Sequence, residues 1–275
     1  MNKPCEKAVV MEILAQSVYR VTPLVLIKTI VKKTGISSLK AKKLLKKLTA
    51  EKELAYTYFF GSTYIELSFN KSVKITENFI LTPAGMKKTG NENHINIFMH
   101  QGISFGSGRH PTTRLSLKAL DHVVKHVKLK FNASDNKPAG LDIGTGSGVL
   151  AIAACKTLVS HCLALDIDQN SLAEAKKNAL LNKLENKIKV SDRDIFALKE
   201  KFSLILANLR YPTLKKLCNQ IKLLSVKGSV LIMSGIRESE KNELITTYAN
   251  RGFKLLWKRD EKNWSSVAME YIYDI

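Results

Sequence analysis

Three glycines at alternate positions, Gly144, Gly146 and Gly148, stand between an apolar run and the helix-forming residues 149–154. This order predicts a strand, a tight turn and a helix, because glycine lets the chain turn sharply and lets a ligand approach the backbone closely. Asp166 ends the next apolar run, roughly 20 residues further on. An acid at the tip of that second strand is placed to bind the hydroxyl groups of a ribose. Together the two features predict a binding site for an adenosine-containing cofactor.

The spacing of the glycines distinguishes two classes of cofactor. A dinucleotide site has glycines at the first, third and sixth positions, so that a helix N-terminus receives the pyrophosphate. Here the spacing is alternate and an acid precedes the turn. This pattern resembles the first motif of the Rossmann-like methyltransferases, and the resemblance implies S-adenosylmethionine, which has no phosphates, as the cofactor. It also implies a cofactor site built from the turn and the next strand end, comprising Asp142, Gly144, Thr145, Gly146, Gly148, Asp166 and Ile167.

A second loop precedes the glycine turn in the chain. Its sequence is Phe-Gly-Ser-Gly-Arg-His-Pro-Thr-Thr, from Phe105 to Thr113, and a helix is predicted directly after it. Together with the glycine turn behind it, this string resembles the loop of the ribosomal protein L11 methyltransferase family. The resemblance implies a loop that closes over the cofactor and helps to present the acceptor. It implies His110 as a catalytic residue, and Phe105, Thr112 and Thr113 as residues at the cofactor.

The ends of the third and fourth predicted strands carry polar residues that the same resemblance assigns to the site. Asp194 is implied to lie near the adenine amino group, although Arg193 replaces the glycine of the family pattern. Asn208 follows the fourth strand at the carboxyl edge of the sheet, where doubly wound folds bind ligands. With Tyr211 it also resembles the Asn-Pro-Pro-Tyr motif of amino-group methyltransferases. Asn208 is therefore expected at both cofactor and acceptor: its carbonyl would accept from the acceptor N–H, while the ring of Tyr211 packs on the acceptor.

The composition is strongly basic, with 44 Lys and Arg against 24 Asp and Glu and a formal net charge of +20. Such an excess attracts polyanions, most often nucleic acids, and the alternative is a well-solvated lysine-rich surface. No apolar run is long enough for a membrane span, and the first residues lack an export signal. Four scattered cysteines predict reduced thiols and a cytoplasmic protein. No metal site is predicted, since His122 and His126 share a helix face without a third ligand.

Residues 1–70 are predicted to form a unit of their own. Three helices and a β-hairpin are expected, at about residues 5–16, 23–34, 39–52 and 55–67. This order resembles a winged-helix domain, whose third helix lies in a DNA groove. Four lysines lie opposite the apolar face of that helix: Lys42, Lys43, Lys46 and Lys47. Lysines favour phosphate contact over the reading of base edges. The alternative is a dimerisation or docking module with a solvated lysine face.

The rest of the chain alternates strands with helices, which is typical of a doubly wound α/β fold. Five strands are expected at about residues 140–143, 162–165, 188–190, 202–207 and 228–236, with a closing hairpin at 252–257 and 264–271. The predicted fold class is therefore α/β, a Rossmann-like methyltransferase with a mostly parallel seven-stranded sheet and a small N-terminal winged helix. The predicted divisions are 1–70, bridging strands at 71–104, and a methyltransferase domain at 105–275. The family resemblance is expected from about Ile95 onward, and Asn170 or Ser171 is the expected cap of the helix after the second strand.

These features favour an S-adenosylmethionine-dependent N-methyltransferase. The resemblance implies that the acceptor is an amino group of a protein, such as ribosomal protein L11. The basic front unit argues for a second possibility, an RNA or DNA acceptor, or a protein that sits on a nucleic acid. A third possibility is a small-molecule methyltransferase that uses its winged helix to dimerise, although no catalytic histidine is evident where such enzymes carry one.

Overall fold

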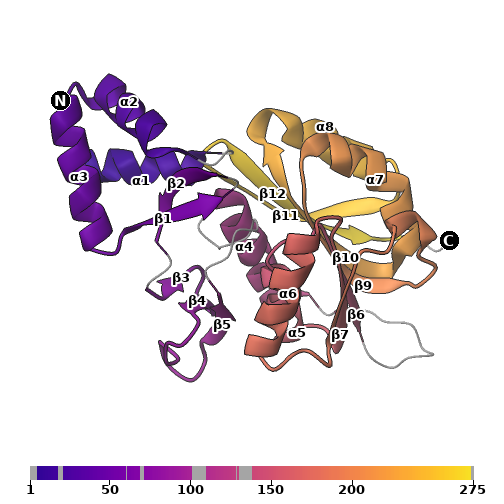
Figure 1. The fold of residues 1–275 in the computed structure, drawn as a ribbon. Helices are drawn as coiled ribbons and strands as arrows, with labels where there is room; N and C mark the ends of the chain where they lie inside the picture. The colour runs from indigo at the N-terminus through magenta and orange to yellow at the C-terminus, as the bar shows by residue number, and fades with distance from the viewer. Residues whose placement is uncertain are drawn as a thin grey trace. The chain divides into compact units, whose positions relative to one another are not determined.

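The computed structural model describes residues 5–17, 21–59, 61–68, 71–100, 110–127, 129 and 138–273. The chain forms two compact units, Met1–Lys71 and Ser72–Ile275 (Figure 1). Each unit has a buried apolar core of its own, as expected for parts that fold around separate centres. Within the described ranges, no helix is both long and apolar enough to cross a membrane.

The first unit consists of three helices and a hairpin: α1 (Glu6–Gln16), α2 (Pro23–Thr34), α3 (Ser38–Ala50), β1 (Leu54–Phe59) and β2 (Ser62–Leu67). The hydroxyl oxygens of Thr22 and Ser37 accept backbone N–H groups at the starts of α2 and α3, and Gly35 ends α2 with a φ of 73°. The three helices enclose an apolar core that includes Ile65 of the hairpin. The elements occur in the predicted order. That they form a winged helix remains a prediction.

The second unit is built on a seven-stranded sheet in the order β11-β12-β10-β9-β6-β7-β8. Its strands are β6 (Ala139–Ile143), β7 (His161–Leu165), β8 (Ile188–Ser191), β9 (Phe202–Asn208), β10 (Ser225–Arg237), β11 (Phe253–Glu261) and β12 (Trp264–Tyr271). β6 to β10 are parallel, whereas β12 runs antiparallel to both of its neighbours. The predicted α/β class with a mostly parallel seven-stranded sheet is confirmed. The carboxyl ends of five strands therefore lie along one edge.

Helices cover both faces of this sheet. They are α4 (Pro111–His126), α5 (Val149–Cys155), α6 (Gln169–Leu181), α7 (Tyr211–Leu224) and α8 (Lys241–Ala249), with single 3₁₀ turns η1 (Ile195–Ala197) and η2 (Glu238–Glu240). α7 and α8 bury their apolar residues against one face, and α4, α5 and α6 pack together on the other (Figure 1). Two-sided cover explains why the central strands β9 and β10 are buried along most of their length.

A small sheet of three strands joins the second unit: β3 (Val73–Lys74), β4 (Phe79–Pro83) and β5 (Ile95–Met99). β4 and β5 are parallel. Two asparagines at the end of α6 hold the end of β5. Asn182, the residue directly after the helix, bonds both the N–H and the C=O of Phe98 at 3.0 and 2.6 Å, and Asn178 accepts from the N–H of His100 at 2.9 Å. The structure thus places residues 72–100 in the second unit, and the division predicted at 70 and 104 stays a prediction.

Two helices begin earlier than the sequence predicts. α6 is capped by Asp168, whose Oδ2 accepts from the N–H and the hydroxyl of Ser171 at 2.9 Å each; the expectation of Asn170 or Ser171 as the cap is wrong. Aspartate is as good a cap, and Asp168 directly precedes Gln169, the first residue of the helix. α4 begins at Pro111, because proline is favoured in the first helical turn. Both starts lie at the carboxyl edge.

Candidate active site

The glycine turn lies between β6 and α5 and is closed by the acid predicted to face it. Gly144, Gly146 and Gly148 all have positive φ angles, of 69°, 54° and 81°. The Oδ2 atom of Asp166, at the end of β7, accepts from the N–H of Gly146 at 2.8 Å, and its Oδ1 accepts from the N–H of Asp168 at 3.0 Å. The half-buried carboxylate thus stands against the turn, where two hydrogen bonds hold it in place.

The acid that precedes the turn is buried and orders it from within. Asp142 accepts at Oδ2 from the hydroxyl of Thr145 at 2.7 Å and from the N–H of Ala151 at 3.1 Å. Its Oδ1 is buried and has no hydrogen-bond partner among the described residues. Burial raises the pKa of Asp142 to about 6, against the lowering effect of the two hydrogen bonds. One carboxylate oxygen therefore joins the turn to α5 while the other remains available.

The ends of β7 and β8 carry exposed apolar side chains beside the acids. Ile167 is 96% exposed and Phe196 is 54% exposed. Asp194 lies between the end of β8 and η1, which it caps by accepting from the N–H of Phe196 at 3.0 Å. Because β7 and β8 are paired, these groups share the carboxyl edge. Exposed apolar surface next to a carboxylate suits a planar heterocycle with an amino group.

The end of β9 is in contact with the end of β10. Asn208 pairs with Ser234 in the parallel ladder, and the N–H of Leu209 donates to the C=O of Ser234 at 3.0 Å. A Cβ on Gly235 would stand 2.4 Å from the carbonyl oxygen of Leu209, so only glycine permits this approach. The Oδ1 atom of Asn208 is buried, and no partner for it occurs in the part of the chain that the structure describes. This oxygen is therefore a buried hydrogen-bond acceptor at the carboxyl edge.

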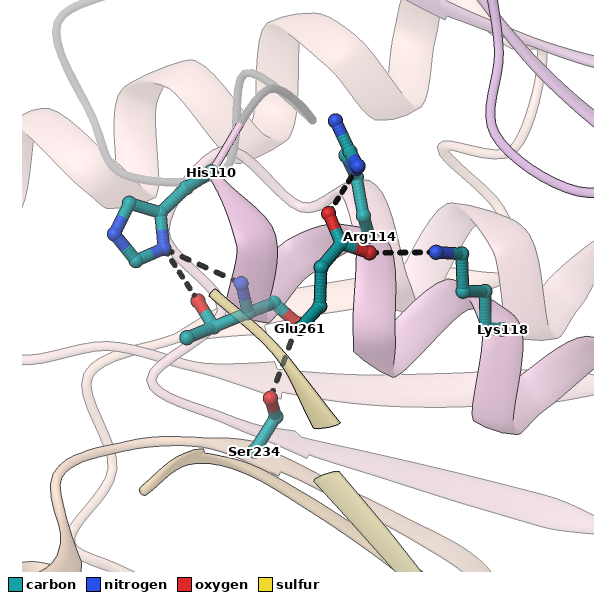
Figure 2. Close-up of polar contacts among 6 residues, drawn as sticks. His110, Arg114, Lys118, Ser234 and Glu261 are labelled. Atoms are coloured by element: carbon teal, nitrogen blue, oxygen red, sulfur yellow. Dashed lines mark hydrogen bonds and ion pairs between the residues drawn. The ribbon is translucent and has the colours of Figure 1, made fainter. Parts of the chain in front are cut away.

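The start of α4 is joined to the same edge (Figure 2). The Nδ1 atom of His110 accepts from the N–H of Thr112 at 3.3 Å and lies 2.8 Å from its hydroxyl. On the other side of this first turn, the hydroxyl of Ser234 donates to the C=O of Thr112 at 3.1 Å. Thr113 is fully buried, and its Oγ1 lacks a partner within the described ranges. The structure thus places Thr112 and Thr113 beside β10, the strand whose Ser234 pairs with Asn208.

Ion pairs hold the next turn of α4 to the far strand. Glu261, the last residue of β11, pairs with both Arg114 and Lys118, with Lys118 Nζ 2.6 Å from its carboxylate (Figure 2). The carboxylate is only 14% exposed, so water weakens these contacts less than at an open surface. The first two turns of α4 are therefore fixed to both β10 and β11.

Two predicted residues are not placed at the site by these contacts. Phe105 lies outside the described residues. Tyr211 begins α7, and its ring lies beside Lys215, whose Nζ is 5.7 Å from the ring centroid and pairs with Glu243 of α8 at 2.7 Å. This places the ring among side chains of α7 and α8, and its role at the acceptor stays a prediction.

The sequence interpretation missed Ser234, Arg237, Glu261 and Trp264. Ser234, Arg237 and Glu261 end or nearly end strands that run toward the carboxyl edge, a position that could have identified them. Trp264 begins β12, and because β12 is antiparallel its first residue lies at the edge where the parallel strands finish. Reading strand direction as well as strand order would have placed all four there.

Comparison with known proteins assigns the second unit. Residues 66–271 match the family model described as ribosomal protein L11 methyltransferase. The chain belongs to this family. The L11 methyltransferase match begins well ahead of Ile95, so the prediction of a likeness starting there is wrong: the short strands β3 and β4 carry no motif that a reader of one sequence could detect. Residues 1–65 lie outside the match.

Individual relatives of this L11 methyltransferase family member agree with the assignment. A ribosomal protein L11 methyltransferase of Geotalea daltonii is 30% identical over 72% of this chain, and one of Fusobacterium nucleatum is 30% identical over 85%. The matched part is 64% of the Geotalea protein and 76% of the Fusobacterium protein. The crystal structure of a ribosomal protein L11 methylase from Lactobacillus delbrueckii subsp. bulgaricus is 25% identical, with a TM-score of 0.63, and covers 74% of this chain and 100% of its own.

Proposed function

We propose that the chain is an S-adenosylmethionine-dependent N-methyltransferase that acts on an amino group of a ribosomal protein. The names of its relatives give ribosomal protein L11 as the protein that they methylate. The observation that carries this proposal is the carboxylate of Asp166, 2.8 Å from the N–H of Gly146, within the segment that matches the family. Ribosomes are cytoplasmic, and the four free cysteines suit that compartment.

The residues at the edge fit the cofactor. Three buried polar atoms without partners in the described part of the chain, Asp142 Oδ1, Thr113 Oγ1 and Asn208 Oδ1, offer hydrogen bonds to a polar ligand. Asp166 would bind the ribose hydroxyls, and Asp194 the adenine amino group. Ile167 and Phe196 would cover the faces of the base, and the glycine turn would admit the amino-acid tail. When bound, S-adenosylmethionine supplies a methyl group activated by a sulfonium.

The protein's part in such a transfer is positioning. Asn208 Oδ1 accepts from the acceptor N–H and so directs the nitrogen lone pair toward the methyl group. The acceptor amine must be neutral, and exclusion of water from the site lowers the pKa of an amine and helps it lose its proton. Burial, and secondarily the charge of Arg237, lower the pKa of His110 to about 4. His110 is therefore neutral near pH 7 and adds no positive charge beside the sulfonium.

The decisive experiment supplies labelled S-adenosylmethionine and the full chain with ribosomal proteins, RNA, DNA or small molecules separately. We expect label in a ribosomal protein. Label in nucleic acid alone, or in small molecules alone, would show that the acceptor belongs to that class and not to the ribosomal proteins. Failure of the chain to bind the cofactor would overturn the enzyme assignment itself.

Two variants separate the cofactor site from the acceptor site. Asp166→Asn should weaken cofactor binding by about tenfold or more, because a charge-assisted hydrogen bond is lost. Asn208→Ala should lower turnover by about a hundredfold, as loss of an orienting group does, while the cofactor dissociation constant changes little. Calorimetry and single-turnover rates measure the two effects. Asn242→Ala, an exposed asparagine on α8, is the matched control. Equal loss of cofactor affinity in both site variants would move Asn208 out of the acceptor site.

We also propose contact with nucleic acid through the exposed face of α3. Four lysines form this face, Lys42, Lys43, Lys46 and Lys47, and all are exposed. Only Lys47 has an acidic partner among the described residues, Glu51 at 3.8 Å. The lysines would contact phosphates of ribosomal RNA and bring the unit to its protein acceptor. Replacing all four with Ala should abolish retention on immobilised RNA at modest salt, whereas the same change at four exposed lysines of the second unit, Lys176, Lys177, Lys183 and Lys187, should not.

A further inference from the structure

An arginine and a histidine both contact one tryptophan ring at the carboxyl edge. Trp264 begins β12 and pairs with Arg237, the last residue of β10, in the antiparallel ladder. The Cζ atom of Arg237 lies 3.8 Å from the centroid of the Trp264 ring, within the range of a cation–π contact. The ring of His110 meets the same indole edge to face, at 5.3 Å between centroids and 67° between planes. Trp264 is only 7% exposed, so the histidine packs against a buried side chain that its neighbours hold in place.

The cap that His110 provides at the start of α4 requires its neutral form. Its Nδ1 atom accepts from the N–H of Thr112 at 3.3 Å and so caps α4. A neutral imidazole with an accepting Nδ1 carries its proton on Nε2. Protonation would place an N–H on Nδ1, facing the N–H of Thr112, so this capping bond would be lost and only the contact with the hydroxyl of Thr112 could remain. The charge state of one ring therefore decides the geometry of the first turn of α4.

The charges around His110 oppose its protonation. The guanidinium of Arg237 lies over the Trp264 ring that His110 also contacts, and the hydrogen bond from Arg237 to Glu240 comes from its backbone N–H, at 2.7 Å. Among the described residues, α4 and β11 bring three further charged groups to this end of the helix, Arg114, Lys118 and Glu261, and Glu261 pairs with both cations. Glu261 is thus shared between two positive side chains. Burial and Arg237 act in the same direction on the ring.

The first turn of α4 is connected to the acceptor residue. The C=O of Thr112 accepts from the hydroxyl of Ser234, and Ser234 pairs with Asn208 across the parallel ladder. Thr113, next in the turn, presents a buried hydroxyl without a partner in the described residues. A change in the cap at His110 would therefore move both threonines relative to Asn208.

We propose that Arg237 and Trp264 are positioning residues for methyl transfer: their stack keeps His110 neutral and so fixes Thr112 and Thr113 beside Asn208. This rests on the proposed function of the site. Neither residue needs to touch the cofactor or the acceptor, since both act through the histidine. Arg237 opposes the charge, and Trp264 holds Arg237 and the imidazole in place.

The test measures His110 directly and does not depend on the cofactor. A proton–carbon NMR titration of the full chain, assigned with His110→Asn, should show the wild-type ring neutral down to about pH 5, well below an ordinary histidine. Arg237→Gln should shift its midpoint upward, Arg237→Lys should restore it, and Trp264→Phe should lie between. Arg259→Gln, at an exposed arginine of β11, is the control that leaves the midpoint unchanged.

Turnover provides the second measurement. Single-turnover rates of Arg237→Gln should fall relative to wild type as the pH decreases from 8 to about 5.5, by roughly tenfold per pH unit below the new midpoint. Arg237→Lys should follow the wild-type profile. An ordinary wild-type midpoint, or a glutamine variant with an unshifted midpoint and an unchanged profile, would overturn the proposal. If the chain bound no S-adenosylmethionine while the midpoint still moved with Arg237, the proposed function would fail but the charge control of His110 would stand.

Discussion

Asp142 is the buried acid on which the glycine turn is built, and its burial makes the stability of the fold depend on pH. Its pKa rises from 3.8 in the unfolded chain to about 6 in the folded protein, chiefly through burial. Between these values the folded state binds the additional proton, so this group's contribution to stability decreases as the pH rises through the window, and it stays constant above about pH 6. At neutral pH the charged, buried carboxylate therefore lowers the free energy of unfolding.

Replacing Asp142 with a neutral residue should remove this destabilisation. In Asp142→Asn the amide oxygen can still accept from Thr145 and Ala151, while no charge is buried. The free energy of unfolding should therefore shift in favour of the variant between pH 4 and 7, by up to about 3 kcal/mol for a change of this size in pKa. Urea unfolding at four pH values measures it. Asp192→Asn, at an exposed acid, should follow wild type, and parallel curves for Asp142→Asn and wild type would contradict the assignment.

His110 contributes with the opposite sign in nearly the same window. Its pKa is lower in the folded protein, about 4 against 6.5, so the unfolded state binds the additional proton there. This contribution is complete above about pH 6.5 and is lost as the pH falls toward 4. The two groups partly offset one another in the wild type. The comparison of Asp142→Asn with wild type isolates the acid because both chains retain His110.

At the scale of elements, the meeting of β9 and β10 depends on one glycine. Gly235 has a φ of 86°, and a Cβ there would collide with the backbone carbonyl of Leu209, which cannot rotate away. Gly235→Ala should therefore lower the free energy of unfolding by more than about 2 kcal/mol. Gly85 has a similar φ of 80° with nothing within 4 Å, so Gly85→Ala should cost only the roughly 1 kcal/mol of the left-handed conformation. Equal losses in urea unfolding would show that backbone conformation alone, without the close approach, sets the cost.

Much of the element order could be predicted from the sequence because local rules determine it. Apolar runs, Pro23 in a first helical turn and glycines such as Gly35 mark starts and stops with physical causes that lie within a few residues. The contact of Asp166 with the glycine turn was predictable for a similar reason, since parallel strand ends in a βαβ unit meet at one edge. These features need no knowledge of distant packing.

The remaining part of the site could not be predicted in this way. Trp264 and Arg237 are adjacent only because β12 runs antiparallel beside β10, and a bulge between Ser234 and Ile236 shifts that register. The hydrogen bond from Ser234 to Thr112 joins residues that are 122 positions apart in the chain. Such contacts follow from register and from close backbone approach, which a single sequence does not specify.

At the scale of the whole molecule, the net charge of +20 is shared by two units with different proposed tasks. The second unit carries the matched family segment, whereas the first lies almost wholly outside it. A basic unit added to a protein methyltransferase is useful if the acceptor protein is bound to RNA, because phosphate contacts raise the local concentration of the acceptor without altering the reaction. The charge of the first unit would then change the Michaelis constant and leave the rate of the chemical step unchanged.

This division leads to a prediction about salt. For an acceptor protein bound to ribosomal RNA, log kcat/KM should fall linearly with log salt, with a slope of about −0.7 to −0.9 for each phosphate contact. Replacing the four lysines of the α3 face with Ala should reduce that slope by about three such contacts, since Lys47 is already paired with Glu51. For the same acceptor freed of RNA, the variant and wild type should have equal rates at all salt concentrations. The matched change at Lys176, Lys177, Lys183 and Lys187 should leave the slope intact. If the slope were the same in wild type and in both lysine variants, the charge of the first unit would only keep its surface solvated and would have no nucleic-acid partner. The acceptor would then be recognised by the second unit alone.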